Sequence, residues 1–246
     1  MTLIFDFLGG RNNYLMTLDG ALDEGLCEEF IEASRHHYKK LFSPGPTLGG
    51  VRPSMKSSMD ASIDREFLKQ QGLDSVSVFS EMYGKAMKAM YIAMAKYKET
   101  YRELWPAPGL TDSGFRFQHY VQAGGWYRQH TDASPWEWHA SGRERQRVLA
   151  VIIYLNSVES GGGTKFPEQK QIVKAKTGRV AIFPASWTHP HMGLTPLSSD
   201  KFIFSSFITC ERSQWDKEKD NEKTESSLIS LKEEPETEEE TAEKDN

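Results

Sequence analysis

Residues 114–132 read GFRFQHYVQAGGWYRQHTD, and the character of the chain changes in this stretch. Phe115, Phe117, His119 and Val121 alternate with other side chains, which is the pattern of a strand with one buried face. Four more runs follow, rich in β-branched and aromatic residues and separated by Gly, Pro and Ser turns. They are VLAVIIYL (148–155), KQIVKA (170–175), GRVAIFP (178–184) and KFIFSSFIT (201–209). Because no helical segments lie between them, we expect an antiparallel sandwich or jelly roll, and not a doubly wound parallel sheet.

The hundred residues before this stretch indicate helices and loops. Apolar residues such as Leu26 and Phe30 recur at helical spacing after Asp19, which we expect to cap the helix. A second, longer helix is expected after Asp74, and the prolines of WPAPGL (105–110) would end it. The methionines of this second helix lie at helical spacing, so we expect them in the core and not at a cofactor.

Charge is distributed unevenly along the 246 residues. The whole chain has a formal net charge of -5. Residues 216–246 contain 13 acidic and 5 basic residues and therefore carry -8, which leaves +3 on residues 1–215. This last segment has no aromatic residue, so we expect a disordered acidic tail. The basic residues before it are scattered and form no stripe with interleaved aromatics, which argues against a nucleic-acid surface.

Several classes of protein are excluded by composition. Hydrophobic residues make up 38% of the chain, enough for a folded core. The longest apolar run, Val148 to Leu155, has eight residues and is too short to span a membrane. The N-terminus has no basic region and carries Asp6, so it does not resemble a signal peptide, and we expect a cytoplasmic protein. Two cysteines cannot form a disulfide framework.

The first chemical motif is His130-Thr131-Asp132. On an extended segment, residues i and i+2 point the same way, so an imidazole and a carboxylate would lie side by side. Alone, this tripeptide is common and is also compatible with a surface turn. A second motif, Thr188-His189-Pro190-His191, follows the run GRVAIFP. Either histidine could complete two imidazoles and one carboxylate, the facial triad of non-haem Fe(II) oxygenases, which leaves coordination positions open.

Lys201, at the start of the last β-rich run, is the third element. On a buried strand its ammonium would need an anionic partner, and a dicarboxylate would supply one. A solvent-facing lysine is the ordinary alternative. His191 lies ten residues before Lys201 and His189 twelve, and the first spacing favours the functional interpretation.

The stretch from Tyr120 to Phe207 resembles the 2-oxoglutarate- and Fe(II)-dependent dioxygenases, and among them the prolyl 4-hydroxylase-like branch. That family has H-x-D, then a distal histidine, then Lys or Arg at the spacing of His191 and Lys201. The resemblance implies a double-stranded β-helix, a jelly roll supported by helices. It is carried by Tyr120 and by GGWYRQHTD (124–132), YLNSVESGGGTKFP (154–167), TGRVAIFP (177–184) and HPHMGLTPLSSDKFIFSSF (189–207).

The resemblance also implies roles for six residues, with no catalytic residue beyond the metal ligands. It implies His130, Asp132 and His191 as ligands of Fe(II), and Lys201, Tyr120 and Tyr154 as residues that bind the cosubstrate 2-oxoglutarate. Lys201 would pair with the C5 carboxylate. The family's H-x-G stretch aligns on His191, which favours it over His189. Trp136, Trp138 and His139 are expected either at a substrate lip or packed outside the roll.

An oxidoreductase that uses O2 is therefore expected. It would hydroxylate an organic substrate, best matched by a peptidyl proline, with succinate and CO2 as co-products and L-ascorbate as reductant. A hydroxylase of another substrate is one alternative. A non-catalytic metal- or ligand-binding jelly roll is the other, although such a module would be expected to lose the intact HxD…H…K set.

Three regions follow from these patterns. We expect residues 1–110 to form a helical support, residues 111–215 the dioxygenase core, and residues 216–246 the acidic tail.

Overall fold

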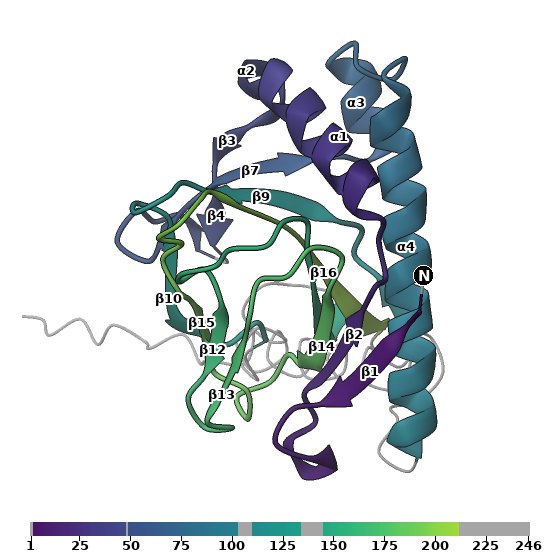
Figure 1. Ribbon diagram of the computed structural model, residues 1–246, viewed down its shortest axis with the longest axis vertical. Coiled ribbons are helices and arrows are strands. Elements are labelled where there is room, and N and C mark those ends of the chain that lie inside the picture. The colour runs from purple at the N-terminus through teal and green to yellow at the C-terminus, as the bar shows by residue number, and fades with distance from the viewer. Residues whose placement is uncertain (1, 48, 103–109, 134–144, 212–246) are drawn as a thin grey trace, which may run out of the picture. The chain divides into compact units, whose positions relative to one another are not determined.

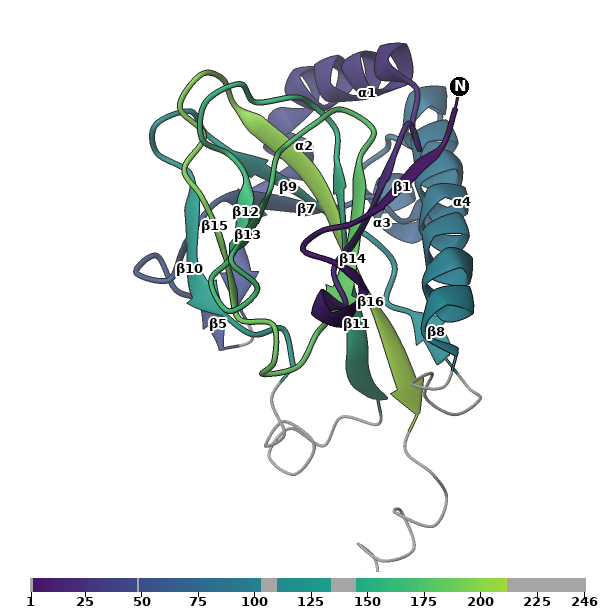
Figure 2. The same cartoon turned by 60° about the horizontal axis from the view of Figure 1, so that its bottom comes forward.

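Two antiparallel sheets form a double-stranded β-helix, with helices packed on the outer face of the larger sheet (Figures 1 and 2). The structure, a computed structural model, describes residues 2–47, 49–102, 110–133 and 145–211. The mainly β architecture and the jelly roll confirm the expected fold class. Within the described residues, no helix is both long enough and apolar enough to cross a bilayer.

The larger sheet contains strands from both ends of the described chain. Its order is β1 (Ile4–Phe7), β2 (Met16–Asp19), β14 (Val180–Pro184), β11 (Arg145–Tyr154), β16 (Lys201–Glu211), β9 (Arg116–Tyr120), β7 (Met59–Ser62) and β3 (Ser43–Pro44), and β8 (Leu110–Asp112) also pairs with β16. The last strand of the described residues, β16, therefore lies in the middle of this sheet. One of its register pairs joins Lys201 to Tyr120 on β9.

The smaller sheet faces the larger one across the interior (Figure 2). Its order is β13 (Gln171–Val173), β12 (Thr164–Phe166), β15 (His191–Gly193), β10 (Trp126–His130) and β6 (Lys56–Ser57). β10 and β15 bring His130 and His191 into register as direct partners. A separate hairpin pairs β4 (Pro46–Thr47) with β5 (Gly50–Val51).

Helices α1 (Glu24–His36) and α4 (Ser77–Thr100) cover the outer face of the larger sheet, and Phe30 joins them to it. The Phe30 ring packs edge-on against Phe79 of α4, and against Phe117 and Phe204 of β9 and β16, at centroid distances of 5.5, 4.9 and 5.3 Å. The shorter helices α2 (Tyr38–Leu41) and α3 (Arg65–Gln70) lie near their ends, whereas η1 (Arg11–Asn13) lies in the connection between β1 and β2. The α4 methionines Met82 and Met90 are fully buried, as expected of core residues.

The two expected helix caps are wrong. Asp23, and not Asp19, caps α1 by accepting a hydrogen bond of 3.0 Å from the Leu26 amide. Asp19 instead ends β2, where its carboxylate pairs with Arg179 and Lys176. α4 begins at Ser77 with Val76 at the N-cap and no side-chain cap, so Asp74 lies outside it.

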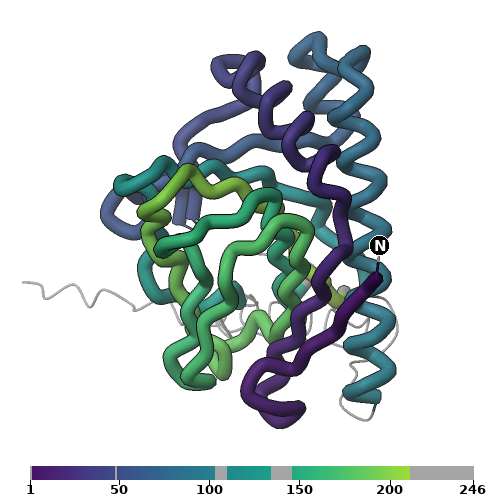
Figure 3. Tube along the Cα trace, in the orientation of Figure 1, coloured from purple at the N-terminus to yellow at the C-terminus, as the bar shows by residue number. Residues whose placement is uncertain are grey.

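The N-terminal hundred residues are not helical alone. β1 and β2 extend the larger sheet beside β14, and β7 extends it beside β9 (Figure 3). The sheets therefore cross the boundary expected at residue 110. These strands are two to four residues long, too short to show a periodicity of two in the sequence. The acidic tail from residue 216 lies outside the described residues.

Candidate metal centre and adjoining cavity

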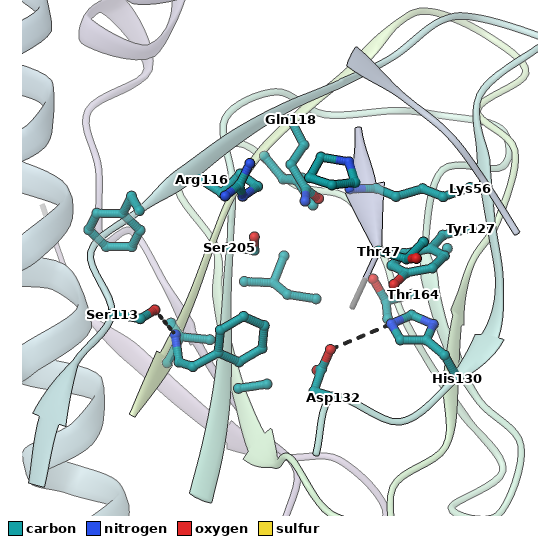
Figure 4. Close-up of a pocket in the computed structure, with 18 of the residues that line it drawn as sticks. Thr47, Lys56, Ser113, Arg116, Gln118, Tyr127, His130, Asp132, Thr164 and Ser205 are labelled. Carbon is teal, nitrogen blue, oxygen red and sulfur yellow. Dashed lines mark hydrogen bonds and ion pairs between the residues drawn. The ribbon is translucent and has the colours of Figure 1, made fainter. Parts of the chain in front are cut away.

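His130, Asp132 and His191 form a group whose ligand atoms all lie within 4.8 Å of one another. His130 ends β10 and His191 begins β15, and their pairing brings the imidazoles together. Asp132 follows β10 in a turn held by the hydrogen bond from its amide to the Ala185 carbonyl, 3.1 Å. One carboxylate oxygen lies 3.5 Å from Nε2 of His130, a contact drawn in Figure 4, and the other lies 3.4 Å from Nε2 of His191.

Both imidazoles are oriented by backbone carbonyl groups. Nδ1 of His130 lies 2.8 Å from the Arg128 carbonyl oxygen, and Nδ1 of His191 lies 3.0 Å from that of His189. A carbonyl only accepts, so each Nδ1 carries the proton and each Nε2 keeps a lone pair directed toward Asp132. This is the arrangement in which protein histidines bind metals, with the outer nitrogen fixed by a hydrogen bond. The donor set therefore fits Fe(II).

The surroundings favour the metal-binding protonation states. Burial lowers the pKa of His191, so this imidazole is neutral near pH 7. Burial opposes ionisation of Asp132, but at the low pH where it titrates His191 and His130 are protonated, and their charge, with that of Arg147, outweighs burial and holds the pKa of Asp132 below its ordinary value. Aromatic rings fix the two histidines: His130 stacks on Tyr127 with centroids 3.6 Å apart, and His191 lies 4.9 Å from the Phe183 ring.

His189 lies outside this group. Its Nε2 lies 2.8 Å from the Asn13 carbonyl oxygen and its Nδ1 lies 2.9 Å from Oγ1 of Thr188, so both ring nitrogens have partners. The His189 amide also closes a turn onto Ser186. Because of this turn, residues 189 and 191 do not share one extended segment, and only His191 is directed toward Asp132.

Lys201 is a buried cation beside the metal group. It begins β16, it is 1% exposed, and its Nζ lies over the rings of Tyr120 and Tyr154, at 4.9 and 5.9 Å. No carboxylate of the described chain lies within ion-pair distance of this ammonium, and burial lowers its pKa to about 7. An unpaired buried ammonium is costly. A carboxylate of 2-oxoglutarate would supply the missing charge.

The two predicted cosubstrate tyrosines occupy different positions. Tyr120 lines the cavity, and its hydroxyl donates to Oε1 of Gln118 at 3.0 Å. Tyr154 is fully buried, and its hydroxyl lies 2.6 Å from Oγ1 of Thr164, which does line the cavity. The structure thus places Tyr120 at the cavity wall and Tyr154 behind Thr164.

A buried ionic network, which sequence reasoning missed, joins the two sheets at the cavity. Lys56 on β6 donates to Oδ2 of Asp60 on β7 at 2.7 Å, and both side chains are at most 2% exposed. Ser58 and Gln118 also donate to the Asp60 carboxylate, at 2.7 and 3.3 Å. Burial lowers the pKa of Lys56, which Asp60 partly offsets. A Lys and an Asp four residues apart in a loop-like stretch give no sequence signal for such a pair.

One cavity of about 610 Å³ contains the metal group, Lys201 and Tyr120. Arg147 and Phe207 line another part of its wall, with the guanidinium 3.7 Å from the ring centroid. Arg147 also donates to the Asp132 carbonyl at 2.9 Å. The expected lip residues, Trp136, Trp138 and His139, lie outside the described residues.

Comparisons with known proteins agree with this geometry. Residues 115–209 match the family described as the 2OG-Fe(II) oxygenase superfamily. Over 69 residues the chain is 39% identical to the "Putative prolyl 4-hydroxylase" of Acanthamoeba polyphaga mimivirus. That match covers 25% of this chain and 28% of the relative, so it spans little more than a quarter of the relative's length.

Solved structures of prolyl hydroxylases share the fold. The viral collagen prolyl hydroxylase of Paramecium Bursaria Chlorella virus-1, in its 2OG complex, has a TM-score of 0.56 at 18% identity and covers 81% of this chain and 98% of its own. A Pseudomonas putida prolyl-4-hydroxylase has a TM-score of 0.56 at 16% identity, covering 82% and 95%. The Trichoplax adhaerens prolyl hydroxylase, in complex with a hypoxia inducible factor peptide fragment, has a TM-score of 0.56 at 17% identity, covering 80% and 84%.

These likenesses show the fold, and the family match covers the segment that carries His130, Asp132, His191 and Lys201. By sequence, residues 115–209 match the 2OG-Fe(II) oxygenase superfamily, and by fold the described chain is similar to solved prolyl hydroxylases, so both comparisons agree with a 2-oxoglutarate-dependent dioxygenase.

Proposed function

We propose that the protein is an Fe(II)- and 2-oxoglutarate-dependent hydroxylase that acts on a peptidyl proline. The observation that carries this proposal is the convergence of His130, Asp132 and His191 in the same cavity as the buried Lys201, which has no carboxylate partner in the described part of the chain. A bound Fe(II) would supply the O2 chemistry that hydroxylates a C–H bond while 2-oxoglutarate is converted to succinate and CO2.

The residues around the metal group prepare the site before any ligand enters. The carbonyl groups of Arg128 and His189 hold the two Nδ1 protons, so that Nε2 of His130 and of His191 remains a ligand. Asp132 supplies the carboxylate. A set of three protein ligands leaves positions for the cosubstrate and O2.

Lys201 would bind the C5 carboxylate of 2-oxoglutarate. Burial alone disfavours its charged form, so an anion at this position gains a strong partner and a nearly dry environment. Tyr120 would hydrogen-bond the same cosubstrate, while Tyr154 would act through Thr164 by fixing its hydroxyl. We also propose L-ascorbate as the reductant that restores Fe(II) after turnovers without substrate.

The proline substrate is supported by the names of the relatives. The mimivirus protein and the three solved structures are all described as prolyl hydroxylases, and one of those structures holds a peptide fragment. The cavity has room for a prolyl ring together with the cosubstrate.

The test has two levels. The protein is incubated with Fe(II), 2-oxoglutarate and ascorbate, and succinate is measured with and without proline peptides, whose mass is followed for the gain of one oxygen. We expect slow succinate release alone and faster release with a hydroxylated peptide. Asp132→Ala serves as the inactive control. Absence of succinate and of 2-oxoglutarate binding would refute the hydroxylase, whereas succinate without peptide oxidation would refute only the proline substrate.

A further inference from the structure

The cavity wall contains an arginine that the proposed chemistry does not use. On β9, Arg116, Gln118 and Tyr120 alternate with Phe117 and His119. The first three line the cavity, whereas Phe117 packs against Phe30 on the helical side of the sheet. Side chains two residues apart on a strand point to the same side, so Arg116 faces the cavity as Tyr120 does. Figure 4 shows its guanidinium across the cavity from Asp132.

Arg116 and Lys201 mark two ends of one cavity. Tyr120 is the register partner of Lys201, and Arg116, four residues earlier, is the partner of Ser205. Four residues of strand correspond to about 13 Å. Lys201 is almost completely buried, whereas Arg116 is exposed. The cosubstrate end is therefore deep, and Arg116 lies toward the open end, where a substrate residue next to the reacting one would lie.

The neighbours of Arg116 leave its charge accessible. Its register partners on both sides, Ser62 on β7 and Ser205 on β16, are small and uncharged, and both line the cavity. Within the described chain, no carboxylate lies within ion-pair distance of the guanidinium. The side chain is exposed, so solvent can reach it.

Three carboxylates of the described chain on this side of the fold have partners other than Arg116. Asp64 caps α3 by accepting from the Phe67 amide at 2.9 Å. Asp60 already receives hydrogen bonds from Lys56, Ser58 and Gln118. Asp132 is directed at the two imidazoles of the metal group.

We infer that Arg116 binds a carboxylate of the substrate, and that the substrate is an acidic peptide with Asp or Glu close to the residue that is hydroxylated. This inference rests on the proposed function and specifies its substrate class. A guanidinium suits the role, because its planar fork binds a carboxylate through two hydrogen bonds and it is weakly hydrated. The alternative source of the same group is a small substrate with a carboxylate of its own.

The test compares peptides that differ only beside the proline, with Glu, Gln or Lys there, and measures kcat/KM for peptide oxidation. We expect the Glu peptide to exceed the Gln peptide by about five- to tenfold. Arg116→Gln should remove this preference, and Arg116→Glu should reverse it in favour of the Lys peptide.

A second experiment compares N-acetylproline with N-acetylprolinamide. If the free acid is preferred and Arg116→Gln abolishes that preference, the carboxylate belongs to a small substrate and the inference of an acidic peptide is wrong.

Two controls separate this inference from the proposed function. Lys88→Glu, like Arg116→Glu, replaces a cation with a carboxylate. Lys88 is exposed on α4, outside the cavity, so this variant should keep the wild-type preference for the Glu peptide. Succinate release without peptide is measured in the wild type and in Arg116→Gln, to show whether each protein is active as an oxygenase. If that release persists but the Glu, Gln and Lys peptides react equally, or none reacts, the Arg116 inference is wrong and the oxygenase stands. If no variant or wild-type protein releases succinate, both are wrong.

Discussion

Lys201 and Tyr120 are direct register partners between β16 and β9, and the ammonium lies 4.9 Å from the centre of the tyrosine ring. The pairing holds a cation in a buried, largely aromatic environment, where the pKa of Lys201 falls to about 7. The aromatic faces attract the charge but do not replace a counter-ion.

The affinity for 2-oxoglutarate should depend on pH through this lysine. A bound carboxylate favours the charged ammonium, so the bound form has a higher pKa than the free form. Affinity is then greatest below pH 7 and falls by roughly tenfold per pH unit above it. The KM for 2-oxoglutarate, measured from pH 6 to 8.5 by succinate release, tests this. Lys201→Arg should give a flat profile, because arginine stays charged, and a flat wild-type profile would contradict the assignment.

Iron retention should distinguish the two histidines of the THPH motif. Asp132→Ala and His191→Ala each remove a ligand atom and should weaken Fe(II) binding by roughly 100-fold or more. His189→Ala should retain iron, because both nitrogens of His189 are used in structural hydrogen bonds. Metal content after gel filtration is the measurement. Loss of iron in His189→Ala with retention in His191→Ala would reverse the assignment.

His189 should instead matter for stability. Its ring connects the turn before β15 to the Asn13 carbonyl at the end of η1. Removal of the ring leaves the partly buried Asn13 carbonyl without its donor, which costs about 1 kcal/mol in the free energy of unfolding. Urea unfolding of His189→Ala in the absence of metal measures this loss. A stability equal to that of the wild type would show that water replaces the donor.

Removing one partner of the Lys56–Asp60 pair should lower the free energy of unfolding strongly, whereas replacing both partners with apolar residues should lower it little. Asp60→Ala leaves a buried ammonium without its carboxylate and should destabilise the protein by about 3–5 kcal/mol. A double change, Lys56→Met with Asp60→Leu, removes both charges and should recover most of that loss. Chemical denaturation of both variants provides the comparison. If the double variant is no more stable than Asp60→Ala, the hydrogen bonds to Ser58 and Gln118 dominate.

The sequence predicts best the long strands that are rich in apolar residues. β11, β14 and β16 coincide with the apolar runs that begin at residues 148, 178 and 201. The H-x-D tripeptide indicated a pair of ligands from the two-residue repeat of extended backbone, although β10 ends at His130 and Asp132 lies just after it. The choice of His191 needed the family spacing, and the turn at His189 shows why local geometry alone left both histidines open.

The features that the sequence could not indicate are mostly short strands and contacts between residues far apart in the chain. The N-terminal strands are too brief to show a pattern, and their partners are β14 and β9, more than fifty residues away. The cap of α1 cannot be chosen by residue type, because Asp19 and Asp23 are equally suitable. Tertiary structure distinguishes them, since Asp19 pairs with Arg179 while Asp23 accepts from the Leu26 amide.

The central place of β16 also has a consequence for how the protein is made. β9 and β11 leave the ribosome long before β16, the strand that lies between them in the larger sheet. Until it arrives, both present open edges that invite pairing with other chains. Contacts between residues so distant in sequence also form slowly. The larger sheet can therefore be completed only after β16 has been synthesised, and a nascent chain that stalls before residue 201 is expected to depend on chaperones.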